Sequence, residues 1–422
     1  MKLAIIGAGQ RGMIYAKYAY EKAGAQIVAV VDINEEKRAV ACEEFKIPSD
    51  MAFSDTKDFF AKGKIADAII LATMDRDHYR QAMAAMDLGY DILLEKPISP
   101  DVKECLEIRD KAKEKGVTIV VCHVLRYTKF FSAIKQVIDS GELGRVITIQ
   151  HAENVGNFHM AHSFVRGNWR NSDLSSPIIM QKSCHDMDIL LWLVGSNCKK
   201  ISSFGNLSFF RKENAPKGAA ARCLDCPCAD QCRFDGKKAY LPIKGAWPAT
   251  VLTEDQTEEG ILKALREGPY GRCVFDCDNN VCDNQVTDIE FENGVTATFH
   301  LSGLTNKMHR TIKVMCENGD ICGDDSEDFI TVTKYSSNYL YEGEIRKIDV
   351  NSEEGFHGGG DYRLTMDFLT ALEHKGETVE IRSGIEQSVE SHLMAYAAEQ
   401  SRISGQVYYM DKLRNSKPGE EK

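Results

Sequence analysis

A glycine-rich turn near the N-terminus constrains the fold more than any other feature of this sequence. The motif Gly7-Ala8-Gly9-Gln10-Arg11-Gly12 follows an apolar segment that begins at residue 2, and a helical pattern follows it to about residue 23. Glycines at these places allow a tight turn, close approach of the backbone to a pyrophosphate and close packing of helix on strand. The helix N-terminus adds positive potential. The sequence therefore predicts a strand, turn and helix that bind a dinucleotide.

A carboxylate at the end of the second predicted strand indicates which dinucleotide is bound. Residues 26–31 form an apolar strand pattern, and Asp32 follows it, about twenty residues beyond the last glycine of the turn. A carboxylate there accepts both hydroxyls of the adenosine ribose and repels a 2′-phosphate. We therefore expect NAD rather than NADP. The expected cofactor ligands from this part of the chain are Gly7, Gly9, Gln10, Arg11, Gly12 and Asp32.

Two further turns follow predicted strands at their carboxyl ends, the edge where open α/β sheets bind ligands. Residues 66–72 lead into Thr73 and His78, where the nicotinamide half of a cofactor would lie. Residues 92–94 lead into Glu95-Lys96-Pro97, and a lysine in such a turn can exchange a proton with a ligand. The alternative is a surface Glu–Lys pair before a loop proline. We expect cofactor contacts from Thr73, His78, Glu95 and Lys96. For His78, capping or packing at the start of the next helix is the alternative.

The order of the predicted elements changes near residue 123. Before it, strands and helices alternate, which is typical of a doubly wound parallel sheet. After it, strand patterns dominate, at 145–154, 200–210, 285–291, 295–302, 311–317 and 328–334. We therefore expect an α/β protein with an N-terminal Rossmann domain at 1–123. A C-terminal α+β domain at 124–422 would contain a large, mainly antiparallel sheet with a hairpin turn at Asn293-Gly294. Its open face suggests a homo-oligomer, either a dimer or a tetramer.

Composition excludes several classes of function. The 422 residues carry a formal net charge of −11, which argues against a general nucleic-acid binder because phosphate contacts need a basic surface. No apolar run approaches the length needed to span a bilayer, and no secretory segment precedes the glycine turn. We therefore expect a cytoplasmic protein with no membrane partner.

Cysteines are concentrated in a strand-poor insertion that extends from about residue 212 to about residue 272. Four of them, Cys223, Cys226, Cys228 and Cys232, lie within ten residues. Four thiolates can bind a tetrahedral zinc ion, and a loop of this length needs a cross-link such as a bound metal to be ordered. A structural zinc site is the favoured interpretation, and reduced free thiols are the alternative. Because the spacing is not that of two standard knuckles, Cys273 could replace Cys228.

With the glycine turn, Asp32, the Glu95-Lys96-Pro97 turn and the strand-rich second half, the sequence resembles the Gfo/Idh/MocA oxidoreductases over nearly its whole length. This is the family of glucose-fructose oxidoreductase and inositol dehydrogenase. The resemblance implies that Lys96 contacts cofactor and substrate, and that an Asp-x-x-x-His at a helix start completes the site. His185 falls on the family histidine, whereas Gln181 replaces the aspartate. Its amide cannot orient the imidazole by charge, although it can donate a hydrogen bond.

In the mechanism that this resemblance implies, a sugar carbinol gives up a hydride and a base takes the hydroxyl proton. The base is His185 or Lys96, and the other positions the hydroxyl. Residues 181 and 185 would share one face of a helix and point at one substrate. A histidine that only packs at a core helix is the alternative. The expected catalytic residues are Lys96, His185 and Gln181.

A stretch at 154–170 is dense in hydrogen-bonding side chains and contains one of the three tryptophans. Polyhydroxylated rings are held by such mixtures, although a solvated crossover with a packed tryptophan is the alternative. Two arginines leave room for an anionic substrate such as a uronate or a sugar phosphate. Arg126-Tyr127 follows the last strand of the first domain and should enter the same site. The expected substrate-binding residues are Arg126, Tyr127, His162, Arg166, Trp169 and Arg170.

These features lead us to expect an NAD-dependent oxidoreductase that converts a secondary hydroxyl of a sugar, glycoside or cyclitol to a ketone. Its partner would be a small carbohydrate or polyol. The resemblance leaves two alternatives. One is a glycosidase that oxidises the sugar, eliminates the aglycone and reduces the product again. The other is a regulator that binds NAD and a partner protein without turnover, which the presence of Lys96 and His185 argues against.

Overall fold

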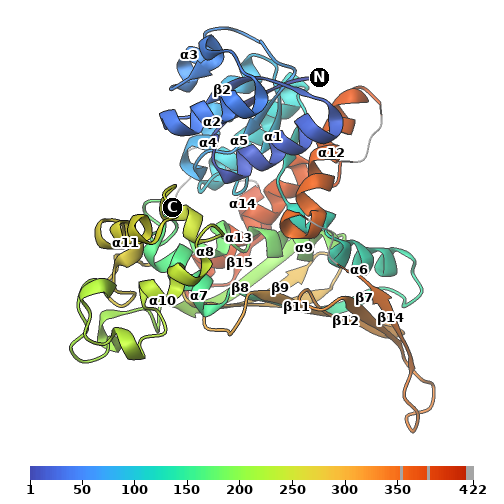
Figure 1. Cartoon of the computed structure of the whole chain (residues 1–422). Coiled ribbons are helices and arrows are strands. Elements are labelled where there is room, and N and C mark those ends of the chain that lie inside the picture. Colours follow the sequence, from blue (N-terminus) through green and yellow to red (C-terminus); the bar gives the residue numbers. More distant parts are fainter. Residues whose placement is uncertain (352–354, 378–380, 415–422) are drawn as a thin grey trace.

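The computed structural model describes residues 1–351, 355–377 and 381–414, and Figure 1 shows two sheets with their helices. The first sheet has six parallel strands in the order β3-β2-β1-β4-β5-β6. All residues of its central strands β4 and β5 are buried, as expected for a parallel sheet covered on both faces. The strands are β1 (Lys2–Ile6), β2 (Gln26–Val31), β3 (Ala52–Phe53), β4 (Ala68–Leu71), β5 (Asp91–Leu94) and β6 (Ile119–Val121).

Helices connect these strands in the alternating order that the sequence predicts. They are α1 (Gln10–Ala23), α2 (Glu35–Phe45), α3 (Thr56–Phe60), α4 (Asp75–Asp87) and α5 (Val102–Lys115). The predicted N-terminal doubly wound sheet is confirmed. The carboxyl ends of β1, β4 and β5 therefore meet at one edge, which faces the second half of the chain.

The second sheet has nine strands in the order β14-β13-β12-β11-β7-β10-β9-β8-β15. Its pairs are antiparallel except β7 with β10, which are parallel, so the predicted large, mainly antiparallel sheet is confirmed. Gly294, with a positive φ of 85°, lies in the turn that joins β9 to β10. The strands are β7 (Val146–Asn154), β8 (Cys198–Asn206), β9 (Asn284–Phe291), β10 (Thr296–Ser302), β11 (His309–Cys316), β12 (Gly319–Asp324), β13 (Phe329–Lys334), β14 (Glu344–Asp349) and β15 (Tyr408–Tyr409).

Helices cover one face of this sheet. The long helix α13 (Ile385–Ser404) packs against α9 (Cys184–Val194) and β8, and both helices are buried along most of their length. Along β7 and β9, buried residues alternate with more exposed ones, so one face of the sheet is covered and the other is open. The remaining helices of this half are α6 (Lys129–Asp139), α7 (Asn157–His159), α8 (Ile178–Gln181), α10 (Gly236–Tyr240), α11 (Glu258–Glu267), α12 (Gly360–Glu373) and α14 (Met410–Arg414).

Helix α12 returns from the second half of the chain to pack against α1 of the first sheet, as Figure 1 shows. The rings of Tyr18 and Tyr362 lie 5.7 Å apart, edge to face. The ammonium of Lys375, just after α12, lies 2.7 Å from the carboxylate of Asp91 in β5. The C-terminal part of the chain is thus tied to the N-terminal sheet by packing and by charge.

Among the described residues, no helix combines the length and the apolar composition needed to cross a membrane. Helix α13, with 20 residues, is long enough, but it carries charged side chains along its length, among them Glu386, Glu390 and Arg402. It packs inside the protein instead.

Candidate cofactor and substrate site

The three glycines of the N-terminal turn have different neighbours. A Cβ atom on Gly7 would lie 2.5 Å from the carbonyl oxygen of Ala72, and one on Gly12 would lie 2.1 Å from that of Gly7. A Cβ on Gly9 would meet no protein atom within 4 Å. Gly9 is the N-cap of α1, and no side chain caps this helix start. The turn therefore leaves backbone N–H groups and open space where a pyrophosphate would approach, so these residues fit the dinucleotide that the motif predicts.

Asp32 lies beside this turn. Its carboxylate accepts hydrogen bonds from the backbone N–H of Ala8, at 2.8 Å, and of Asn34, at 2.9 Å. The side chain is partly exposed, so both oxygens keep room for further donors. This position fits the predicted contact with the ribose hydroxyls. Gln10 is exposed at the first turn of α1.

Arg11 and Glu95 form an ion pair below the turn. Nε of Arg11 donates to Oε1 of Glu95 at 2.8 Å, and its Nη2 contacts Tyr15 and Asp361. The other oxygen of Glu95 accepts the backbone N–H of Lys96 at 2.9 Å. Burial opposes the charged carboxylate, but Arg11 and Lys96 outweigh it and lower the pKa of Glu95. These contacts favour a structural role for both residues, and their predicted contacts with the cofactor stay predictions.

Thr73 and His78 link the ends of neighbouring strands. The hydroxyl of Thr73 donates to Gln81 at 2.6 Å. The ring nitrogens of the buried His78 face the carbonyl oxygens of Pro97, at 2.9 Å, and Thr73, at 3.1 Å. His78 thus holds the Lys96-Pro97 turn against the end of β4, which favours a positioning role.

Lys96 reaches from the end of β5 to helix α8, which lies outside the first sheet. Its Nζ donates to the backbone carbonyl of Gln181 at 3.0 Å. The carbonyls of the last helical turn have no partner within their own helix, and Gln181 is the last residue of α8. The next helix, α9, begins at Cys184, so the expectation that residues 181 and 185 share one continuous helix is wrong. The break makes the carbonyl of Gln181 available to the lysine.

His185 lies in the first turn of α9 and is almost fully buried, at 7% exposure. The pKa of His185 is lowered well below its usual value, first by burial and second by the positive charge of Lys96. The imidazole is therefore neutral near pH 7 and has one nitrogen with a free lone pair. Among the described residues, its Nδ1 has no hydrogen-bond partner. The structure thus brings together Lys96, Gln181 and His185.

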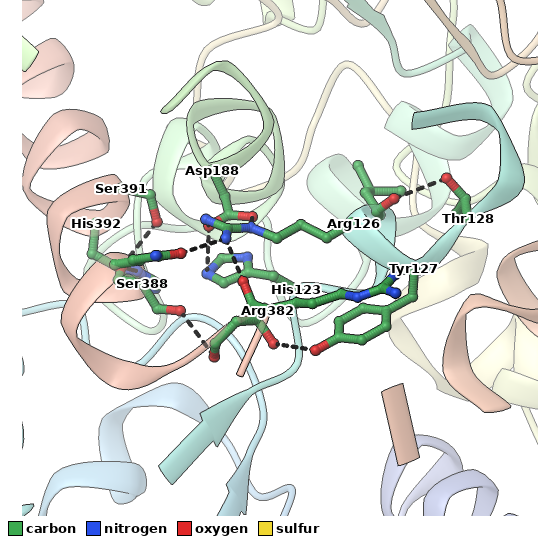
Figure 2. Close-up of polar contacts among 12 residues, drawn as sticks. His123, Arg126, Tyr127, Thr128, Asp188, Arg382, Ser388, Ser391 and His392 are labelled. Carbon is green, nitrogen blue, oxygen red and sulfur yellow. Dashed lines mark hydrogen bonds and ion pairs between the residues drawn. The ribbon is translucent and has the colours of Figure 1, made fainter. Parts of the chain in front are cut away.

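His123, next to His185, belongs to a buried polar group that Figure 2 shows. Nε and Nη2 of Arg126 donate to the two carboxylate oxygens of Asp188, both at 2.7 Å. The ring of His123 lies between those of His185 and His392, 5.6 Å from each. All five side chains are at least nine-tenths buried. Arg126 is therefore occupied by protein partners, which favours a structural role rather than the predicted contact with substrate.

Other predicted substrate ligands are also engaged by the protein. The hydroxyl of Tyr127, which Figure 2 places beside the buried group, donates to Asp367 at 2.7 Å. Arg170 makes a bidentate pair with Asp278, at 2.7 and 2.9 Å. Trp169 is 36% exposed and packs near Phe164. Of these three predicted ligands, Trp169 alone keeps a large exposed surface.

Arg166 and His162 attach the β8–β9 segment to a π-helix, Met160–Arg166. Arg166 is buried and donates to the carbonyls of Arg272, at 2.7 Å, and Phe234, at 2.8 Å. The ring of His162 stacks on that of Tyr270 with 4.6 Å between centroids. Both side chains therefore contact the insertion, and their predicted roles toward a substrate stay predictions.

The predicted zinc site is not supported. Cys223, Cys226, Cys228, Cys232 and Cys273 line one small cavity of about 20 Å³, so the cluster does bring the thiols together. Throughout the part of the chain that the structure describes, however, no group of three or more His, Cys, Asp or Glu side chains is arranged to hold a metal ion. All fourteen cysteines are free thiols.

Three charged residues next to the site are absent from the sequence-based expectations: Glu153, Lys182 and Arg310. Lys182 follows Gln181 directly, and Glu153 is an acidic residue on the covered face of β7. A charged residue at a position where the alternation predicts a buried one is the signal that would have identified Glu153.

Comparison with known proteins agrees with this architecture. Residues 1–123 match the model of an oxidoreductase family with an NAD-binding Rossmann fold, and residues 135–410 match the C-terminal alpha/beta domain of the same family. The putative oxidoreductase YteT of Bacillus subtilis is 23% identical over 359 residues, 82% of each chain. Inositol 2-dehydrogenase of Klebsiella pneumoniae is 26% identical over 203 residues, which cover 48% of this chain and 56% of that relative.

Solved structures share the whole fold at low identity. Levoglucosan dehydrogenase, in complex with NADH and L-sorbose, has a TM-score of 0.70 at 17% identity, over 98% of this chain and 99% of that one. An oxidoreductase from Agrobacterium radiobacter, in complex with NAD⁺, L-tartaric acid and magnesium, has the same TM-score at 15% identity, with the same coverage. Both family models together span nearly the whole chain, and the protein therefore belongs to the Gfo/Idh/MocA family of NAD-binding oxidoreductases.

Proposed function

We propose that this protein is an NAD-dependent dehydrogenase that oxidises a secondary hydroxyl of a sugar, glycoside or cyclitol to a ketone. The observation that carries the proposal is the hydrogen bond from Lys96, at the carboxyl edge of the parallel sheet, to the carbonyl of Gln181, four residues before the buried His185. Relatives named inositol 2-dehydrogenase and a structural neighbour named levoglucosan dehydrogenase support this class of substrate. Asp32 supports NAD over NADP, because a carboxylate there repels a 2′-phosphate.

The residues of the site divide the chemistry between them. When bound at the glycine turn, NAD supplies the acceptor for the hydride. His185 is neutral in the free protein, because burial and the neighbouring charge of Lys96 disfavour its protonated form. A neutral imidazole has a free lone pair, and that nitrogen accepts the hydroxyl proton. Lys96 donates a hydrogen bond to the same oxygen and stabilises negative charge that develops there. The carbonyl of Gln181 and the carboxylate of Glu95 hold the lysine in place.

The experiment that tests this proposal is nicotinamide absorbance on mixing the protein with a panel of inositols, sugars and aryl glycosides, with either NAD or NADP. We expect NADH from one class of polyol and little NADPH. Lys96→Ala should lower turnover roughly a hundredfold or more, since it removes a positioned hydrogen-bonding group. Lys199→Ala, an exposed lysine paired with Glu290 on the second sheet, is the matched control.

The outcomes separate the proposal from its rivals. Equal activity of wild type and Lys96→Ala would remove Lys96 from the site. Release of an aglycone without net NADH would establish the redox-cycling glycosidase instead. No reaction with any polyol, together with tight binding of NAD, would contradict the dehydrogenase.

A further inference from the structure

A buried charged group lies next to the site, and the roles described so far do not use it. Glu153, near the end of β7, is fully buried, and its Oε1 lacks a hydrogen bond within the described residues. Nζ of Lys182 lies 3.6 Å from Oε1 of Glu153, and the guanidinium of Arg310 forms an ion pair with Oε2. A buried oxygen without a hydrogen bond, such as Oε1, is unusual in native proteins, and the nearest cation to it is Lys182.

The fold explains why these charges meet. Arg310 of β11 is the direct cross-strand partner of Glu153, and both project from the face of the sheet that the helices cover. Arg310 also donates to Asp186 at 2.8 Å, and His151 contacts the same carboxylate at 2.8 Å. Both groups contact Oδ1 of Asp186, whereas its Oδ2 has no hydrogen-bond partner among the described residues. Lys182, by contrast, lies beyond hydrogen-bond distance of Glu153, so its ammonium keeps donors for another acceptor.

Lys182 is placed to act together with Lys96. Lys182 follows Gln181 directly, and the carbonyl of Gln181 accepts a hydrogen bond from Lys96. The side chain of Lys96 therefore ends next to Lys182 along the backbone. Both are partly exposed, whereas Glu95, Pro97, Gln181 and Ser183, their neighbours along the chain, are buried. The side chain of Lys182 keeps 16% exposure and contacts Met308, which is half exposed just before β11. Burial lowers the pKa of Lys182, and the charge of Lys96 contributes in the same direction, so the two ammonium groups lie near each other.

The charged neighbours of Lys182 balance one another. Glu153 and Asp186 are acidic, whereas Arg310 and Lys96 are basic. A local environment of this kind offers no strong excess of positive charge to attract an anion. It suits a neutral ligand with hydroxyl groups, since an ammonium has three N–H donors and Glu153 fixes it from one side.

We propose that Lys182 donates a hydrogen bond to a second hydroxyl of the substrate, distinct from the one that Lys96 and His185 serve, and that Glu153 positions Lys182. This inference rests on the proposed dehydrogenase function and narrows its substrate to neutral polyols that present two hydroxyls at once. Lys182 is then a specificity residue, and Glu153 is a positioning residue that does not touch the substrate. The site would discriminate against analogues in which that second hydroxyl is missing.

The test compares each polyol with its single-deoxy analogues, in the presence of saturating NADH. The probes are myo-inositol, D-glucose and their single-deoxy derivatives, and the measurement is the dissociation constant from quenching of NADH fluorescence. For the wild type we expect one deoxygenation, apart from that of the reacting carbon, to weaken binding about tenfold or more, as loss of a hydrogen bond to a charged group does. Lys182→Met should reduce this difference to about twofold or less.

Controls separate recognition from stability. Lys199→Met is the matched substitution at an exposed lysine, and it should keep the full discrimination. Glu153→Gln should lose part of this discrimination, because the ammonium of Lys182 then lacks the neighbouring carboxylate that positions it. Removing one partner of a buried pair often destabilises a protein more than removing both, so the double variant E153Q/K182M serves if the single variants do not fold. Thermal unfolding of each variant shows which of them are folded, and the dissociation constants are compared among the folded variants.

The possible failures are distinguishable. If polyols bind and Lys182→Met keeps the wild-type discrimination at every position, the role of Lys182 is wrong while the dehydrogenase proposal stands. If no polyol binds to the NADH complex of the wild type, both fail together, because Lys182 then has no hydroxyl to hold.

Discussion

At the scale of single residues, the burial of His185 predicts a characteristic pH dependence. Its pKa is lowered well below the usual value, first by burial and then by Lys96, so the neutral base is present at all pH values above that lowered pKa. We expect kcat/KM for oxidation to stay level as the pH falls through the usual histidine pKa of about 6.5 and to decline only in more acidic solution. A pH series with the preferred polyol measures this. A rate that rises steadily through the alkaline range would assign the base role to an amine instead.

The sequence predicts some residue roles better than others because of where their partners lie. Lys96 and His185 belong to short motifs, and Lys96 bonds to the backbone four residues before His185. The ion-pair partner of Arg126 is Asp188, 62 positions along the chain, and that of Arg170 is Asp278, 108 positions along it. A local pattern of arginines shows that a cation is present. It does not show which distant carboxylate neutralises that cation after folding.

At the scale of elements, the turn between β1 and α1 separates glycines that the fold needs from one that a ligand needs. Gly12→Ala would place its Cβ against the carbonyl of Gly7, so we expect it to lower the free energy of unfolding by at least about 2 kcal/mol. Gly9→Ala meets no protein atom and has an extended backbone with a negative φ. It should keep the stability and weaken NAD binding roughly tenfold, a loss of about 1.4 kcal/mol.

Chemical denaturation and titration with NAD measure the two effects separately. Equal NAD affinity of wild type and Gly9→Ala would show that the cofactor does not approach this turn. A stable Gly12→Ala protein would show that helix α1 can shift away from β1 without cost.

The strands that the sequence predicts are those with a clear apolar alternation. β9 and β11 alternate buried with more exposed residues along their whole length and lie close to the predicted limits. β12 contains two glycines, and β14 lies at the edge of the sheet with almost every residue exposed, so neither has the pattern. The sequence also does not indicate the helix break at residues 182–183, because neither a proline nor a glycine marks it.

At the scale of the whole molecule, the open face of the second sheet supports the predicted oligomer. Phe204 of β8 and its cross-strand partner Val286 of β9 are 67% and 38% exposed. Adjacent exposed apolar side chains on a sheet often mark an interface between chains. We expect a mass of two or four chains by light scattering, and a smaller mass for Phe204→Glu. A monomeric wild type would contradict this prediction, and Lys199→Glu on the same strand is the control for added charge.

The return of α12 to the first sheet has a consequence for biosynthesis. Three contacts of the nucleotide-binding half come from far downstream: Arg11 pairs with Asp361, Asp91 with Lys375, and the N–H of Val121 with the carbonyl of Ser383. A ribosome makes these partners only when most of the chain has already emerged. The N-terminal sheet is thus translated early, but it reaches its final set of contacts late, when nearly the whole polypeptide is available.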